Sequence, residues 1–141
     1  MTSNQAVALP PFNALQEAMF GALASDLTGV GVFDNVPENQ VNPWVTIGEV
    51  NGVPDNWLGG FGWLITATCH VWTKSQGFKS ALDIAAEIVG IMDHRRTSLN
   101  VGAGWYVVSI RFENLQTMRD PDPKIRHVPV QFQVVIHQQE V

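Results

Sequence analysis

Hydrophobic and polar side chains alternate along two stretches in the last third of the chain. In the second stretch the apolar positions are Val128, Val130, Phe132, Val134 and Ile136. In the first they are Tyr106, Val108, Ile110 and Phe112. A period of two residues is typical of a half-buried strand. The two stretches therefore predict a long antiparallel hairpin with one apolar face. Pro129 cannot donate to a ladder, which predicts an unpaired side near the start of the last strand.

Earlier in the chain the pattern predicts three more strands and two helices. The strands are expected over residues 32–36, 44–50 and 61–73. The helices are expected over 12–27 and 78–92, where apolar residues recur every three or four positions. Asn13 and Gln16 fit the N-cap and capping-box positions of the first helix. Because each element has one apolar face, the fold class is predicted to be α+β: a mainly antiparallel β-sheet with two α-helices packed on one face.

Composition limits the domain organisation and the partners. The chain has 141 residues, of which 45% are hydrophobic and 15% charged. This size suits one domain, expected over 12–141 and preceded by a flexible N-terminus over 1–11. Charged residues usually make up about 25% of a chain, so more surface than normal is neutral and suited to protein contacts. The net charge of −5 argues against broad adhesion to nucleic acid or to anionic membranes.

Neither a membrane span nor a signal peptide is predicted. The apolar runs are shorter than the ~18 residues that a span requires, and the N-terminus lacks a basic region followed by an apolar core. The chain is expected to be made and kept in a cytosol. Cys69 is the single cysteine and falls on the apolar side of the strand predicted over 61–73, so we expect a buried thiol that acts as a small hydrophobe.

The densest charge surrounds a proline-locked corner at residues 118–127. Asp120 and Asp122 can hydrogen-bond to their own backbone two residues further on, which favours a rigid turn. Arg119 and Arg126 flank the turn and are expected to share Asp120 or Asp122 in a charge-assisted network. A plain, internally satisfied hairpin loop is the simpler interpretation.

Large apolar side chains also occupy a segment rich in turn residues. Residues 51–60 contain Trp57 and Leu58 beside several glycines and a proline. These side chains either fold back on this domain or dock on another subunit, and the residues leave both open. The second face of the strand over 61–73 includes His70 and Trp72 and is not strongly charged, as expected for a surface that contacts neighbours.

Known catalytic and metal-binding motifs are missing. The sequence holds no glycine-rich phosphate loop, no nucleophile elbow and no paired cysteines. Its four histidines are scattered, and turn formation already accounts for Asp120 and Asp122 beside His127. No catalytic residue, cofactor or metal ion is therefore predicted, and a binding or assembly module is favoured over an enzyme.

An ordered set of short motifs resembles one known family. The motifs are Leu15–Leu23, Val32–Pro37, Pro43–Glu49, His70–Thr73, Val108–Glu113, Arg119–Asp122 and Arg126–His127. Together they resemble the tail-completion or tail-terminator family of long-tailed bacteriophages and gene transfer agents, over about residues 12–135.

The resemblance implies a structural virion protein of the tail or neck, assembled in the cytoplasm of a bacterial host. It implies a hexameric ring at the head-proximal end of the tail tube, which stops tube polymerisation and joins the tail to the head. The implied partners are copies of the chain itself, the major tail tube protein and the head-tail connector or stopper protein. DNA is expected to pass through the lumen without sequence-specific binding, and no membrane is involved.

Seven residues are hypothesised to form interfaces on this basis: Trp57, Leu58, Trp72, Arg119, Asp120, Asp122 and Arg126. Two other classes of protein stay open. The chain can be another neck component, such as a connector stopper, which its position in the particle would distinguish. It can also be a small ligand-binding or catalytic α+β domain with a polar pocket near His70 or His127.

Overall fold

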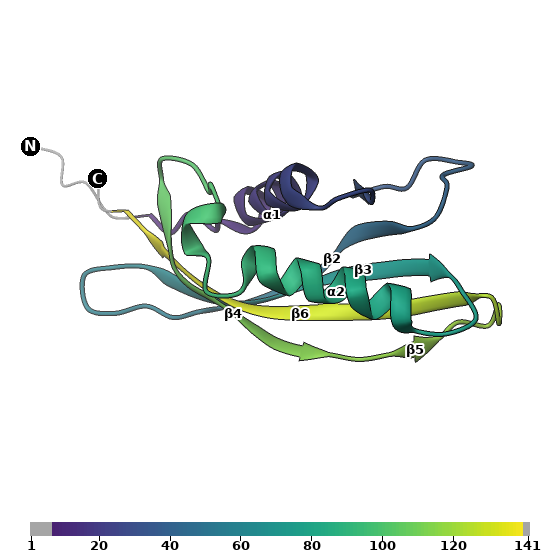
Figure 1. The fold of residues 1–141 in the computed structure, drawn as a ribbon. Coiled ribbons are helices and arrows are strands. Elements are labelled where there is room, and N and C mark those ends of the chain that lie inside the picture. Colours follow the sequence, from purple (N-terminus) through teal and green to yellow (C-terminus); the bar gives the residue numbers. More distant parts are fainter. Residues whose placement is uncertain (1–6, 140–141) are drawn as a thin grey trace, which may run out of the picture.

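The computed structural model describes residues 7–139, which form one mixed sheet with two helices on one side of it (Figure 1). The predicted flexible segment over 1–11 lies partly outside these residues, since residues 1–6 are not described. In chain order the elements are α1 (Phe12–Asp26), β1 (Gly31–Phe33), β2 (Trp44–Pro54), β3 (Gly62–Lys74), α2 (Lys79–Met92), a 3₁₀ turn (Arg96–Ser98), β4 (Trp105–Leu115), β5 (Met118–Arg119) and β6 (Ile125–Gln138). The predicted α+β class is confirmed.

The sheet has the strand order β1-β2-β3-β6-β4, and the short β5 also pairs with β6. β1 and β2 are parallel, and every other described pairing is antiparallel. The predicted antiparallel pairing of β4 with β6 is confirmed. The single apolar face predicted for β4 is wrong at its start, where Val107 is buried and Tyr106 is exposed, because the register shifts between Val107 and Ser109. The second strand of this pair, β6, is an interior strand of the sheet, because it also pairs with β3 along its length, from Gly62 opposite His137 to Lys74 opposite Ile125.

Pro129 lies where β4 has ended and β5 has not yet begun. The last β4 residue, Leu115, faces Val130, and the first β5 residue, Met118, faces His127. The carbonyl of Pro129 accepts a hydrogen bond from Gln116 N in this gap. The side of the strand that lacks a donor therefore faces the interruption between β4 and β5, as the sequence predicted.

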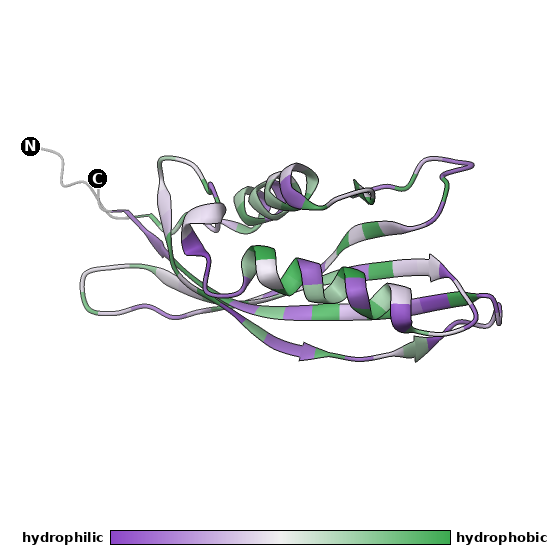
Figure 2. Ribbon diagram, viewed as in Figure 1, coloured by the Kyte–Doolittle hydropathy of each residue, from purple (hydrophilic) through white to green (hydrophobic). Residues whose placement is uncertain are grey.

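The core lies between the sheet and the helices. On β3 the odd-numbered positions from Trp63 to Thr73 are buried, and on β6 the even-numbered positions from Val128 to Ile136 are buried. Both helices contribute buried residues to the same cluster: Leu15, Ala18, Met19, Ala22 and Leu23 from α1, and Ala81, Ile84, Ala85, Ile88 and Met92 from α2. Figure 2 shows the corresponding alternation of hydrophobic and hydrophilic positions along β6 and α2.

The predicted cap of α1 is wrong. The helix begins at Phe12, so Asn13 already lies in its first turn, and no side chain caps the N-terminus. Gln16 does not fold back to complete a capping box. Its side-chain amide donates instead to Asp34 Oδ1 at 2.8 Å and ties α1 to the segment after β1.

The outer edge of β4 is closed by the chain that leaves α2. His94 adopts a left-handed backbone conformation with φ of 57°, which turns the chain toward β4. Its N–H donates to the Ile110 carbonyl at 2.9 Å, and Asp93 Oδ1 accepts from Phe112 N at 2.7 Å. Two backbone groups of this edge strand are thus satisfied within the chain.

The other face of the sheet carries neither helix, and we call it the helix-free face. Its side chains on β3 and β6 are mostly half-buried and mostly polar or aromatic, among them Thr66, His70, Trp72, His127, Gln131, Gln133 and His137. Within residues 7–139, no helix has the length and apolar character needed to cross a membrane.

Candidate assembly surface

The turn between β2 and β3 is an ordered hairpin tip, although its sequence resembles a loose loop. Trp57 and Gly60 exchange two backbone hydrogen bonds of 3.2 and 3.1 Å. Gly59 has φ of 90°, a conformation that favours glycine in a tight turn. The indole ring of Trp57 lies over Gly60, where a Cβ would come within 2.1 Å of the ring. The tip is therefore a built structure that fixes the direction of its side chains.

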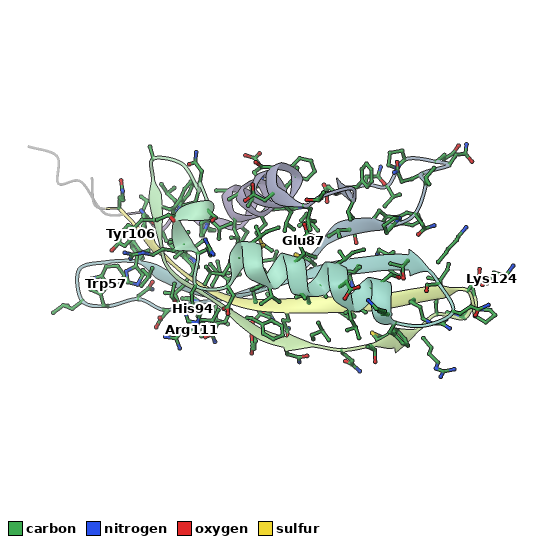
Figure 3. The ribbon with its side chains drawn as sticks, in the orientation of Figure 1. Trp57, Glu87, His94, Tyr106, Arg111 and Lys124 are labelled. Atoms are coloured by element: carbon green, nitrogen blue, oxygen red, sulfur yellow. The ribbon has the colours of Figure 1, made fainter. Side chains whose placement is uncertain are left out.

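Trp57 and Leu58 have different environments at this tip. The Trp57 ring packs against His137 at a tilt of 38°, with ring centres 4.4 Å apart, and Tyr106 meets the same imidazole in an edge-to-face arrangement. Trp57 and Tyr106 lie at the same end of the molecule (Figure 3). Tyr106 Oη lies 3.2 Å from His137 Nδ1. Leu58 has no such shelter and is fully exposed. The sequence left folding back and docking on another subunit both open. Trp57 packs partly on this domain but is 41% exposed, and Leu58 points into solvent, so docking stays open for both residues.

Trp72 lies on the helix-free face, on β3. Its indole N–H donates to Thr46 Oγ1 on β2 at 3.2 Å, which satisfies the polar end of the ring. On its other side the ring stacks on His127 of β6, with centres 3.8 Å apart and planes 6° from parallel. The ring thus bridges three neighbouring strands, and it is held in one orientation.

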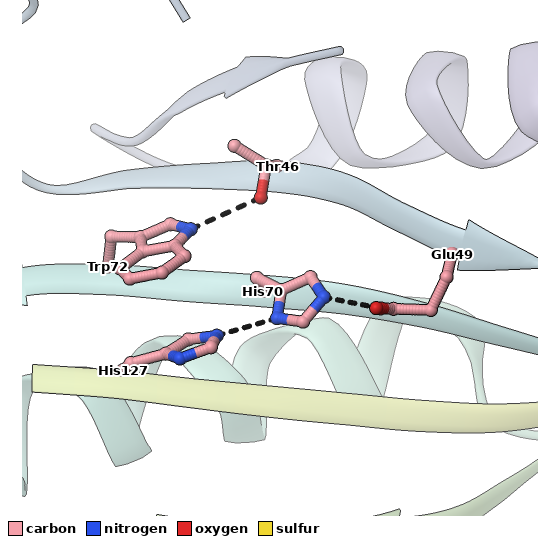
Figure 4. A network of polar contacts seen from close by, with 5 residues as sticks. All are labelled: Thr46, Glu49, His70, Trp72 and His127. Atoms are coloured by element: carbon pink, nitrogen blue, oxygen red, sulfur yellow. Dashed lines mark hydrogen bonds and ion pairs between the residues drawn. The ribbon is translucent and has the colours of Figure 1, made fainter. Parts of the chain in front are cut away.

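Two histidines and a glutamate continue this network (Figure 4). His70 Nδ1 lies 2.6 Å from His127 Nε2, and His70 Nε2 lies 2.5 Å from Glu49 Oε1. Both contacts are satisfied when His70 and His127 each carry a proton on Nε2. His70 then donates from Nε2 to the carboxylate and accepts at Nδ1 from His127 Nε2. Gly48 makes room for this arrangement, because a Cβ at this position would lie 2.5 Å from the His70 ring.

The surroundings change the proton affinity of two groups in the network. Burial lowers the pKa of His127, and the nearby His70 lowers it further, against the opposing effect of Asp120 and Glu49. The pKa of Glu49 is also lowered, first by a hydrogen bond from its own backbone N–H and then by His70, while burial acts in the opposite direction. The geometry therefore favours a neutral His127 beside an ionised Glu49.

The histidines are less scattered than the sequence indicated. Trp72 faces His127 directly across the β3–β6 ladder, and His70 lies two residues along β3 on the same face. The sequence could place Trp72 and His70 on one face of their strand. It could not predict their contact with His127, because that contact requires two strands to pair whose histidines are 57 residues apart in the sequence.

The network does not form a metal site. Among residues 7–139, no group of three histidine, cysteine or acidic side chains could hold a metal ion. The facing nitrogens of His70 and His127 hydrogen-bond to each other instead.

The network is also separate from the hollows described in the surface. One hollow is lined by residues between Arg96 and Val107, and another by Lys74, Gln76, Lys124 and their neighbours. Neither includes His70 or His127, beside which a ligand-binding domain of this class was expected to hold its pocket.

Cys69 is fully buried, and its burial raises the pKa of the thiol to about 12. A thiol with so high a pKa carries almost no thiolate near neutral pH, so it is a poor nucleophile and a poor metal ligand. This agrees with the prediction of a small buried hydrophobe.

The corner between β5 and β6 is held by the side-chain-to-backbone hydrogen bonds that the sequence predicted. Asp120 Oδ1 accepts from Asp122 N, and Asp122 Oδ1 accepts from Lys124 N, both at 3.0 Å. Arg126 donates to the carbonyls of Pro123 and Gln76 at 2.6 and 2.8 Å.

Within the described chain no ion pair joins Arg119 or Arg126 to Asp120 or Asp122, so the predicted shared network is wrong. The turn amides already occupy the carboxylates. The guanidinium of Arg126 reaches across to the β3–α2 loop, and Arg119 is exposed on β5.

The family described as tail completion protein gp17 has a model that matches residues 17–137. That match covers most of the chain, so the chain belongs to this family. It is accordingly a structural protein of a phage-type tail, which confirms the family resemblance predicted from the sequence.

A solved structure shows the same fold. One chain of a structure titled "Virion of native gene transfer agent (GTA) particle" aligns with a TM-score of 0.83 at 21% sequence identity. The alignment covers 92% of this chain and 99% of that chain. A comparison with curated proteins found no match.

Proposed function

We propose that this protein is the terminator of a phage or gene-transfer-agent tail. Six copies form a ring at the head-proximal end of the tail tube, stop the addition of major tail tube protein, and present a surface to the head-tail connector or stopper. The ring resides in the neck of the virion after assembly in the bacterial cytoplasm. The role is structural and non-enzymatic, and family membership together with the shared fold supports it.

The observation that carries the proposal is the hairpin tip of β2 and β3. The tip is rigid, it extends from one end of the sheet (Figure 1), and it presents a fully exposed leucine. An apolar side chain held rigidly in solvent gains free energy when a partner covers it, at roughly 25 cal/mol per Å² of buried apolar surface. In a closed ring such a tip can reach the next copy or the tube beneath it.

The charge of the chain suits a channel for DNA. The net charge of −5 provides no broad attraction for phosphates, so DNA can pass through the ring without being held by nonspecific contacts.

The corner at β5 and β6 is the second proposed contact region. Asp120 and Asp122 hold the turn, Arg126 ties it to the β3–α2 loop, and Arg119 is exposed beside it. We propose that this corner presents a docking edge. Trp72 is proposed as a further contact, since its ring is fixed on the face of the sheet that no helix covers.

Leu58→Ser tests the hairpin tip. Because Leu58 is fully exposed and does not pack on the core, the substitution should leave the thermal unfolding temperature unchanged. It should reduce the fraction of ring measured by gel filtration with light scattering. Val41→Ser, at an exposed position outside the helices and strands, is the matched control. Electron microscopy of particles made with each variant gives the tail length. Normal rings and normal tails with Leu58→Ser would refute the role of the tip, and a ring located on the connector rather than the tube would identify a stopper.

Asp120→Ala tests the corner. The substitution removes the acceptor for Asp122 N, so it should loosen the turn and weaken assembly. Glu113→Ala, an exposed carboxylate on β4 with no described side-chain partner, serves as the control. Unchanged assembly and unchanged thermal stability in Asp120→Ala would exclude the proposed role.

A further inference from the structure

A hollow opens beside the start of β4, at the border of the sheet opposite β1. It has a volume of about 380 Å³ and is lined by residues of the 3₁₀ turn, of the segment after that turn and of β4. Three of the lining residues, Leu99, Val101 and Val107, are buried, whereas Arg96 and Thr97 are exposed. A hollow with apolar residues inside and polar residues around it suits an apolar side chain of a protein partner.

Hydrogen bonds hold the walls of this hollow in place. The indole N–H of Trp105 donates to the Leu9 carbonyl at 2.7 Å. Within the lining segment, Gly102 N donates to Asn100 Oδ1 at 3.1 Å. Because the walls are already ordered, a partner that fills the hollow loses little free energy to ordering of the chain.

Leu58 is an apolar side chain without shelter in its own chain. It is more exposed than any other large apolar side chain in residues 7–139, and the hydrogen-bonded turn of Trp57 and Gly60 holds it in place. The tip contributes no residue to the lining of the hollow in the same copy. A cavity of about 150 Å³ already holds benzene, which has more carbon atoms than a leucine side chain, so the hollow is large enough for Leu58.

The hairpin tip and the hollow lie at the same end of the sheet but on different sides of it. Gly62, which follows the tip, faces His137 on β6, and Tyr106 at the start of β4 faces the same histidine. In the strand order, β6 separates the two strands of the tip from β4. Figure 1 shows the tip and the chain that leads into β4 at the same end of the molecule. When copies stand side by side in the same orientation, the tip of one copy and the hollow of the next are therefore at the same level.

We infer that Leu58 of one copy occupies the hollow of the next copy in the ring. The inference rests on the proposed function and assigns the tip to the neighbouring copy instead of the tail tube. The contact joins two different surfaces, so it is heterologous. Each copy offers one Leu58 and one hollow, and the series returns to the first copy when the rotation closes. Burial of the leucine against the apolar lining supplies the free energy of the contact, and no ion pair is needed.

Cross-linking between copies tests this contact. Leu58→Cys and Thr97→Cys are made in separate chains, mixed during assembly in solution and on tail tubes, and treated with a short bismaleimide, which joins two thiols that lie close together. A covalent dimer should form in the mixture and in neither variant alone. Cys69 does not compete, because it is buried. Val41→Cys mixed with Thr97→Cys is the matched control, since Val41 is also exposed but lies in the segment before β2.

Filling the hollow tests the contact from the other side. Thr97→Trp places a large ring in the hollow and should weaken ring formation by about tenfold or more in sedimentation velocity, as should Leu58→Ala. The two substitutions together should weaken it no further, because both remove the same contact. Thr28→Trp, the same substitution at an exposed threonine after α1, is the matched control. Unfolding curves establish that every variant is folded.

The possible outcomes separate this contact from the ring itself. If the wild-type protein forms rings, but the mixture gives no cross-link or the two substitutions leave the rings unchanged, the contact is overturned and the ring stands. A covalent dimer of Leu58→Cys with itself, or its cross-link to another tail protein, would also overturn the contact. If the wild-type protein forms no ring in solution or on tail tubes, both the ring and the contact are overturned.

Discussion

Gly48 is a position on the helix-free face where a single added methyl group should destabilise the fold. A Cβ added there would lie 2.5 Å from Cδ2 and 2.6 Å from Nε2 of His70, and 2.8 Å from the backbone oxygen of Thr68. Carbon contacts are favourable at about 3.5–4.0 Å, so all three distances are repulsive. The His70 ring can rotate away, but the Thr68 carbonyl belongs to β3 and cannot.

Overpacking of this kind costs about 1–3 kcal/mol of the free energy of unfolding. For a chain of this length, that corresponds to a fall in the melting temperature of roughly 3–10 °C. If His70 moves to make room, it also loses its contacts with Glu49 and His127. The backbone of Gly48 has no positive φ, so the expected loss arises from steric contact alone.

Urea and thermal unfolding of Gly48→Ala measure the loss, and NMR of the imidazole protons follows His70 and His127. Gly90→Ala is the matched control: this glycine is in the interior of α2, a Cβ there would meet nothing within 4 Å, and the substitution should stabilise the helix by about 0.5–1 kcal/mol. A Gly48→Ala protein as stable as wild type, with unchanged imidazole signals, would refute the steric reasoning.

Three further predictions concern single residues. Because the pKa of His127 is lower in the folded chain than in the unfolded chain, its contribution to the free energy of unfolding should be constant above about pH 6.5 and should fall as the pH drops through that value toward the folded-state pKa. His127→Gln should flatten this pH dependence in urea titrations from pH 8 to 5. An unchanged dependence of the free energy of unfolding on pH in the variant would contradict the prediction. Arg126→Ala removes hydrogen bonds to two carbonyls and should lower the free energy of unfolding by about 1–3 kcal/mol. Arg126→Lys should be equally destabilised, because lysine lacks the forked guanidinium. Wild-type stability in Arg126→Lys would show that the positive charge alone matters. Cys69 should react with a thiol reagent at least a hundredfold more slowly in the folded protein than in urea, and equal rates would show that the strand opens.

The regular elements could be predicted because each leaves a local pattern. The period of two in β3 and β6 gives both the strands and their buried faces, and the apolar stripe of α2 gives the helix within one residue of its observed start. The turn at Asp120 and Asp122 was predictable for the same reason, since its hydrogen bonds join residues two apart.

The rest depended on contacts between distant parts of the chain. The meeting of His70 with His127 requires β3 to pair with β6 in one register, which periodicity does not specify. The partner of Arg126 is the carbonyl of Gln76, which is 50 residues away in the sequence. Because the sequence pattern does not show such a distant partner, an ion-pair network within the same hairpin was predicted instead. The order of the hairpin tip was missed because its glycines indicate a loop, whereas the packing of Trp57 on His137 joins it to the far end of β6.

The hydrogen bonds of Asp93 and His94 to the edge of β4 affect how readily folded copies aggregate before they are assembled into a particle. Exposed strand backbones template cross-β growth, and such growth has no natural stopping point. Here the middle of one outer strand is occupied internally, whereas at the opposite border β1 pairs only with Trp44, Val45 and Thr46 and leaves the outer side of the rest of β2 without a strand partner in the described chain. Strand-to-strand growth between concentrated copies should therefore be hindered at β4, and where it occurs it should begin along the second half of β2.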